Sequence, residues 1–244
     1  MARIDDLLTA ALKALPAKPS ATAEQKLKRR YSERVSEAVA SALADELRDR
    51  GLSEARPAPP GVLGGSGAER RMAGGLGAKK VDVTWATPEA GLLLAVSVKT
   101  INFRDGKTGN FQKNLTNRRG DMLMEAVTLH RRFPYGVLAG LFFLDKGAGS
   151  DGTSKRRSTF LNAHARLHLF TGRNDPAGRD EQFELFYILL MDADPQTFDL
   201  RAYKVGKPDT PVTLDEIMTD LLTLVAERNP DFYELDDGRI RAAT

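Results

Sequence analysis

The chain has 244 residues and 41% of them are hydrophobic, so it is long enough and apolar enough to bury a core rather than stay disordered. It contains no cysteine, which excludes disulfide bonds and thiolate zinc sites, while its net charge of +3 neither identifies nor excludes a polyanionic partner. No apolar segment approaches the roughly 20 residues that span a bilayer, and the N-terminus lacks the apolar core of a signal peptide, so we expect a cytoplasmic protein with no membrane partner.

The N-terminal part of the chain is predicted to be helical. Residues 1–15 show the apolar spacing of a short amphipathic helix, and a linker that contains two prolines follows, so we expect residues 1–22 to form a short helix and linker. A long helix is predicted over residues 23–50, because apolar residues recur there at helical spacing and Gly51 ends the pattern. Residues 56–77 are rich in proline and glycine and predict a loop.

From residue 79 onward, short strand-like runs alternate with helical periodicity. The expected strands are 79–87, 92–100, 135–145, 181–192 and 198–205, and the expected helices are 116–133, 158–170 and 214–227. The first two strands are joined by the turn sequence PEAG and should pair as a hairpin, with Trp85 in the core or, alternatively, in contact with a base. Strand 135–145 is apolar on both faces, as in the interior of a mixed sheet flanked by helices. We therefore predict a single α/β domain over residues 23–244.

Basic residues gather after the second expected strand. Between Lys99 and Arg132 there are eight lysines and arginines but only three acids, which suits a polyanion, although a solvated helix face with basic loops would show the same pattern. Residues 155–157 are expected to form a flexible basic arm or, equally, an ordinary solvated loop. The residues expected to contact DNA phosphates are Lys79, Lys80, Arg104, Lys107, Lys113, Arg118, Arg119, Lys155, Arg156 and Arg157.

Asp82 lies within the first expected strand, where an isolated carboxylate is costly unless it is paired or binds a cation. Lys99 ends the partner strand, so the two side chains can lie side by side on one face of the hairpin. A carboxylate that binds Mg²⁺, next to an ammonium group that orients water, can support hydrolysis of a phosphodiester. A plain salt bridge across the hairpin is the alternative interpretation.

The order of helix, strand with aspartate, strand ending in lysine, helix and strand resembles the PD-(D/E)xK nuclease superfamily, which includes type II restriction endonucleases and several repair nucleases. The resemblance covers residues 23–145 and is carried by Val81-Asp82-Val83 and Ser97-Val98-Lys99. It implies a restriction-endonuclease-like mixed β-sheet flanked by helices, with a helical N-terminal region. Two positions depart from the family pattern, because Val81 replaces a proline and Ser97 replaces the second carboxylate.

The resemblance suggests where the missing acid would come from. One subgroup of restriction endonucleases, which cut CCGG-centred sequences, also reads S-V-K and takes its second acid from the following helix, where this chain has Glu125. Many members of the superfamily use a glutamate of the first helix, which points to Glu46, and Glu69 in the glycine-rich loop is a third candidate. A degenerate site that lacks the acid is the remaining alternative.

These observations predict a Mg²⁺-dependent endonuclease of restriction type that cuts double-stranded DNA as a homodimer. Asp82 and Glu125 would bind the metal, with Glu46 as the alternative acid, and Lys99 would position the attacking water. Base-reading residues are expected in 101–116 or 147–157. A repair or junction-resolving nuclease, a catalytically inactive DNA-binding module and a protein that does not bind nucleic acid remain as alternatives.

Overall fold

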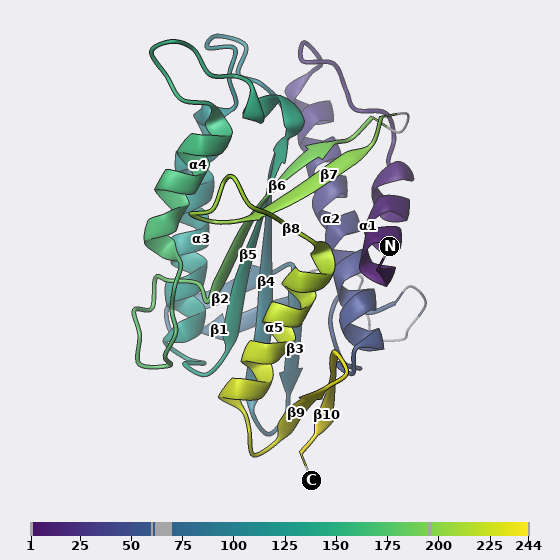
Figure 1. Ribbon diagram of the computed structural model, residues 1–244, viewed down its shortest axis with the longest axis vertical. Helices are drawn as coiled ribbons and strands as arrows, with labels where there is room; N and C mark the ends of the chain where they lie inside the picture. The colour runs from purple at the N-terminus through teal and green to yellow at the C-terminus, as the bar shows by residue number, and fades with distance from the viewer. Residues whose placement is uncertain (1, 60, 62–69, 195–196, 244) are drawn as a thin grey trace.

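The computed structural model describes residues 2–59, 61, 70–194 and 197–243, and it shows a mixed α/β fold built on a six-stranded sheet (Figure 1). The strand order is β3-β4-β5-β6-β7-β8, with bounds Val83–Thr87, Gly91–Ile101, Val137–Asp145, Leu185–Asp192, Asp199–Lys204 and Pro211–Val212. Strands β4, β5 and β6 are parallel to one another, whereas β3, β7 and β8 pair antiparallel with their neighbours. The predicted mixed sheet and the hairpin of β3 and β4 are therefore confirmed.

Helices cover both faces of this sheet. Their bounds are Arg3–Lys13 (α1), Gln25–Asp49 (α2), Leu115–His130 (α3), Thr159–Leu167 (α4) and Leu214–Arg228 (α5). Because side chains alternate along a strand, β4 sends Val96 and Val98 into the core beneath α1, α2 and α5, and Ala95 into the core beneath α3 and α4. Apolar residues on both faces of β4 and β5 follow from this burial between two helical layers.

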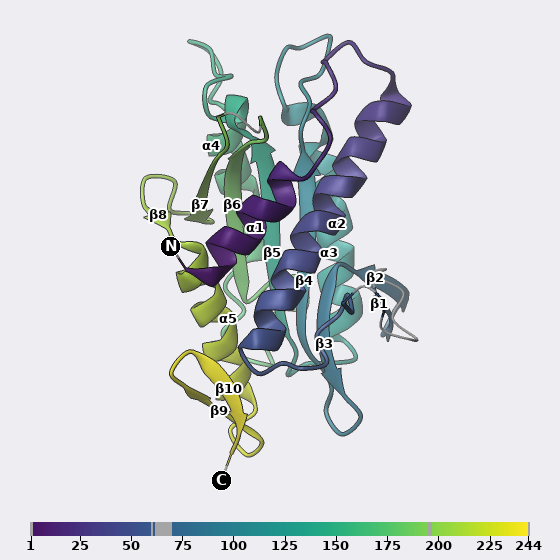
Figure 2. The same cartoon turned by 90° about the vertical axis from the view of Figure 1, so that its right-hand side faces the viewer.

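The N-terminal helix belongs to the first of these two cores. Ile4, Leu8 and Leu12 of α1 are buried in the same cluster as Tyr31 and Val35 of α2, and the two helices lie side by side (Figure 2). The division of the chain at residue 22 stays a prediction. Within the described part of the chain, no helix is both long enough and apolar enough to cross a bilayer.

The structure differs from the sequence prediction mainly in its small hairpins. Strand β1 (Arg70–Gly74) forms in the segment predicted to be a loop and pairs with β2 (Gly77–Val81) as a separate two-stranded sheet. The run predicted as one strand over 79–87 is therefore two strands, β2 and β3, that diverge at Asp82. A C-terminal hairpin of β9 (Tyr233–Asp236) and β10 (Arg239–Ala242) was not predicted.

The C-terminal hairpin explains the position of Trp85. Its ring is buried and meets the ring of Tyr233 edge-on, with the ring centroids 5.0 Å apart. Trp85 therefore contributes to the core, and the alternative of a base contact is not supported by its position.

Candidate active site

Asp82 lies at a bend between two strands. Strand β2 ends at Val81 and β3 begins at Val83, and these two valines are buried in the cores on opposite faces of the sheet. The Oδ2 atom of Asp82 accepts a hydrogen bond of 2.7 Å from the backbone N–H of Val98, just beyond Val96, where the pairing of β3 with β4 stops. The carboxylate thus takes the place of a strand partner, and this bond fixes it at the end of β4.

Lys99 lies between two carboxylates. Its Nζ atom is 3.7 Å from Oδ2 of Asp82 and donates a hydrogen bond of 3.4 Å to Oε2 of Glu125 on helix α3. All three side chains are largely buried. Residues 17 and 26 positions away from Lys99 in the sequence therefore meet at the end of one strand.

Glu125 reaches the position that Ser97 cannot fill. Side chains two apart in a strand share a face, so Ser97 and Lys99 both point from β4 toward α3. Ser97 is buried, and its hydroxyl is one of the groups that lower the pKa of Glu125. Of the two candidate acids that the structure describes, Glu46 and Glu125, it is Glu125 that lies next to Lys99.

In this cluster, burial and the neighbouring opposite charges shift the pKa of each side chain in opposite directions. Burial disfavours the ammonium form of Lys99, but the carboxylates of Glu125 and Asp82 outweigh it and raise the pKa of Lys99 above its usual value. Burial raises the pKa of Glu125, and the attraction of Lys99 only partly offsets it. The guanidinium of Arg118 is close enough to act against the charge of Lys99, so a second cation lies beside the cluster.

The donor set fits a hard cation such as Mg²⁺. Among the described residues, no group of three or more histidine, aspartate or glutamate side chains is placed to hold a metal ion. Mg²⁺ does not require such a group, because it keeps several of its waters and is commonly held by one or two carboxylates. Asp82 and Glu125 lie on either side of the same ammonium group and are the residues that would hold it.

Glu46 does not lie with this cluster. It is buried near the C-terminal end of α2, where it accepts hydrogen bonds of 2.7 Å from both Arg3 and Arg50, and Arg50 also pairs with Asp215 of α5. Its burial within an apolar stripe reflects this ion-pair network between α1, α2 and α5. The structure therefore gives Glu46 a role in packing instead of the predicted role in catalysis, and Glu69 lies outside the described residues.

Replacing Glu46 by glutamine is expected to destabilise the fold by about 2 kcal/mol, because it leaves the largely buried Arg50 with one acidic partner instead of two. Urea unfolding followed by circular dichroism measures the change. The control is Asp49→Asn on the same helix, whose exposed pair with Arg239 should contribute at most about 1 kcal/mol. Equal stability of both variants would contradict the network.

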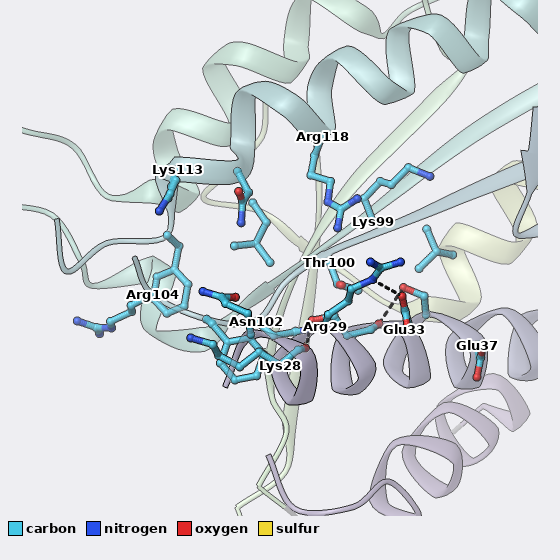
Figure 3. Close-up of a pocket in the computed structure, with 18 of the residues that line it drawn as sticks. Lys28, Arg29, Glu33, Glu37, Lys99, Thr100, Asn102, Arg104, Lys113 and Arg118 are labelled. Carbon is cyan, nitrogen blue, oxygen red and sulfur yellow. Dashed lines mark hydrogen bonds and ion pairs between the residues drawn. The ribbon is translucent and has the colours of Figure 1, made fainter. Parts of the chain in front are cut away.

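A cavity of about 910 Å³ opens beside Asp82 and Lys99, between α2, the end of β4 and the start of α3 (Figure 3). Its lining includes seven basic and four acidic side chains, so the net charge is positive. The basic lining residues are Lys28, Arg29, Lys80, Lys99, Arg104, Lys113 and Arg118. A cavity of this charge next to two carboxylates and a lysine is suited to hold a phosphate-containing ligand.

The residues predicted to contact phosphates divide into two groups. Lys80, Arg104, Lys113 and Arg118 line the cavity, whereas the others do not, namely Lys79, Lys107, Arg119, Lys155, Arg156 and Arg157. Among the latter, the guanidinium of Arg119 stacks over the ring of Phe170, and Lys107 is exposed. The expected arm at 155–157 is a tight turn: the backbones of Thr153 and Arg156 pair, and the Arg156 side chain bonds the carbonyl of Asp151.

Sequence reasoning missed the contribution of helix α2 to the cavity. Lys28, Arg29, Ser32 and Glu33 line it from the first turns of α2, where the hydrophobic pattern shows only an exposed face. The signal available in the sequence is the basic run at residues 26–30, which contains four basic side chains.

Comparison of the chain with protein-family models, with curated proteins and with solved structures found no match.

Proposed function

We propose that this protein is a Mg²⁺-dependent endonuclease of the PD-(D/E)xK type, with a restriction-endonuclease-like fold, that hydrolyses phosphodiester bonds of double-stranded DNA. The observation that carries the proposal is the meeting of Asp82, Lys99 and Glu125 at the end of β4. The basic cavity beside them supports a polyanionic substrate. The mixed sheet between two helical layers is compatible with this fold.

Lys99 acts as a cation and hydrogen-bond donor in the proposed reaction. The carboxylates of Glu125 and Asp82 raise the pKa of Lys99 above its usual value, which favours the ammonium form. Asp82 and Glu125 hold Nζ between them and limit its rotamers. The ammonium then orients the attacking water and stabilises the charge that develops on the phosphate oxygens, as a preorganised donor does in a partly buried site.

Asp82 and Glu125 would also hold Mg²⁺, which supplies charge stabilisation at the phosphate when it is bound. The Val98 N–H that bonds Asp82 fixes the orientation of this carboxylate at the end of β4. Arg118 lines the cavity beside Lys99 and contacts the cleaved phosphate or its neighbour. We further propose that two copies act together, because cutting both strands at a two-fold site requires two active sites.

Cleavage of supercoiled plasmid tests the proposal directly. The wild type should nick or linearise plasmid with Mg²⁺ and not with excess EDTA, and Lys99→Ala should be at least about 100-fold slower. Lys207→Ala, which removes an exposed lysine in the turn after β7, is the matched control and should cleave at the wild-type rate.

The pattern of products separates the related nucleases. Discrete fragments from plasmid indicate a restriction enzyme, and preferential cutting of branched DNA indicates a repair or junction-resolving enzyme. Binding without cleavage across several divalent metals indicates an inactive DNA-binding module. Equal cleavage by the wild type and Lys99→Ala would contradict the proposed site.

A further inference from the structure

Asn102 occupies a distinctive position in the cavity. It is the first residue after β4, three residues beyond Lys99, and its side chain lies in the cavity lining with Lys28 and Arg104 nearby (Figure 3). Only 3% of the residue is exposed. A buried amide normally has hydrogen-bond partners for both its oxygen and its nitrogen.

The orientation of this amide follows from its neighbour Ser32. The Ser32 hydroxyl donates its single hydrogen to the carbonyl of Lys28 at 3.1 Å. It can therefore only accept from Asn102, which lies 3.1 Å away, so the atom that faces Ser32 must be the amide nitrogen Nδ2. These two hydrogen bonds therefore identify the atom of the amide that faces away from Ser32 as the oxygen Oδ1.

The Oδ1 atom of Asn102 is buried and has no hydrogen-bond partner among the described residues. Leaving a buried acceptor unpaired is unfavourable, and groups of this kind in a cavity commonly receive a ligand or a water molecule. An amide oxygen accepts hydrogen bonds, so its ligand must present a donor. The surrounding lysines and arginines already provide for phosphates, which are acceptors and would not bind Oδ1.

We propose that Asn102 reads a nucleobase of the bound DNA by accepting a hydrogen bond from an exocyclic amino group. This inference rests on the proposed function, because it takes DNA as the ligand. In the major groove, adenine N6 and cytosine N4 are donors, whereas guanine O6 and N7 and thymine O4 are acceptors. Asn102 therefore favours adenine or cytosine at one position on the strand that it contacts.

The position of the base relative to the cleaved bond follows from the strand geometry. Three residues separate Lys99 from Asn102, which corresponds to roughly 10 Å along an extended strand. The same length covers about three base steps along a duplex. Asn102 should thus read a base within about three steps of the phosphate next to Lys99. Ser32 accepts one of the two Nδ2 hydrogens, so the contact assigned to the base is the one made by Oδ1.

Selection from a randomised duplex tests the inference through binding alone, in buffer without Mg²⁺. DNA retained by the wild type should be enriched roughly fivefold in adenine or cytosine at one position, as expected for one net hydrogen bond. Asn102→Leu should lose the enrichment at that position and bind the selected duplex roughly fivefold more weakly than the wild type. Ser32→Ala, which releases Nδ2, should weaken the enrichment, and Asn174→Ala, an exposed asparagine outside the cavity, should leave it unchanged.

A second arm removes the amino group instead of the side chain. Replacing the selected adenine by purine, or the selected cytosine by a base without N4, should weaken wild-type binding roughly fivefold and leave Asn102→Leu unaffected. The inference is overturned if the wild type binds no DNA, shows no such enrichment, or shares its enrichment with Asn102→Leu. Selective binding by the wild type without cleavage would instead contradict the nuclease proposal and leave the role of Asn102 supported.

Discussion

Glu125→Gln is expected to slow Mg²⁺-dependent cleavage by roughly 100- to 1,000-fold while leaving the fold intact. Glutamine keeps the shape of the side chain and removes the charge that would bind the metal. It also removes one of the two carboxylates that hold the Lys99 ammonium in place. Single-turnover cleavage of a labelled duplex measures the rate, and calorimetric titration of Mg²⁺ should show weaker binding to the variant.

The matched control is Asp121→Asn on the same helix. Asp121 is exposed and forms a long, solvent-exposed ion pair of 3.8 Å with Arg118, so its removal should change the rate little. A double variant tests the site further: Ser97→Glu combined with Glu125→Ala should recover part of the lost rate, because a carboxylate at 97 would enter from β4 on the same face as Lys99. A Glu125→Gln enzyme as fast as the wild type would exclude Glu125 from the site.

The main sheet was predictable because its strands carry a clear signal. Strands buried on both faces read as continuous apolar runs, as in β5, and helices between them show a different period. The small hairpins gave no such signal. Strands β9 and β10 are short and largely polar, and β1 follows a segment dominated by glycine and proline. Their formation depends on contacts with the finished core, such as that of Tyr233 with Trp85.

The site was predictable in part for a similar reason. The hairpin register sufficed to bring Asp82 near Lys99, and the position of Glu125 at the border of an apolar helix face indicated its burial. The spacing of apolar residues along a helix predicts which side chains are buried, but not which neighbouring residues each buried side chain faces. Glu46 is as buried as Glu125, yet it faces Arg3 and Arg50, and no local pattern relates residue 46 to residue 3. Only the packing of α1 on α2 decides between the two acids.

Glu184→Gln is expected to cause the largest loss of stability, because the Glu184 carboxylate is bonded to several buried groups that are not part of the proposed active site. Its carboxylate accepts hydrogen bonds from the backbone N–H of Leu138 (2.7 Å) and from Arg228 (2.8 Å), and lies 3.3 Å from Nε of Arg173. His130 contacts the same carboxylate at 3.2 Å. Two arginines and a histidine from three separate segments therefore share this carboxylate, although Arg173 also lies 3.5 Å from a carboxylate oxygen of Asp180.

The expected loss is about 3–5 kcal/mol, since glutamine cannot neutralise Arg173, whose side chain is fully buried, or Arg228. Urea unfolding at neutral pH measures it. Glu181→Gln is the matched control three residues earlier, where the partner Arg179 is exposed and the expected change is below about 1 kcal/mol. A loss confined to Glu184→Gln would show that charge pairing with Glu184 stabilises this end of the sheet. Similar values for the two variants would mean that the other partners of Arg173 suffice to stabilise its charge, namely Asp180 and the carbonyls of Gly178, Pro134 and Pro176.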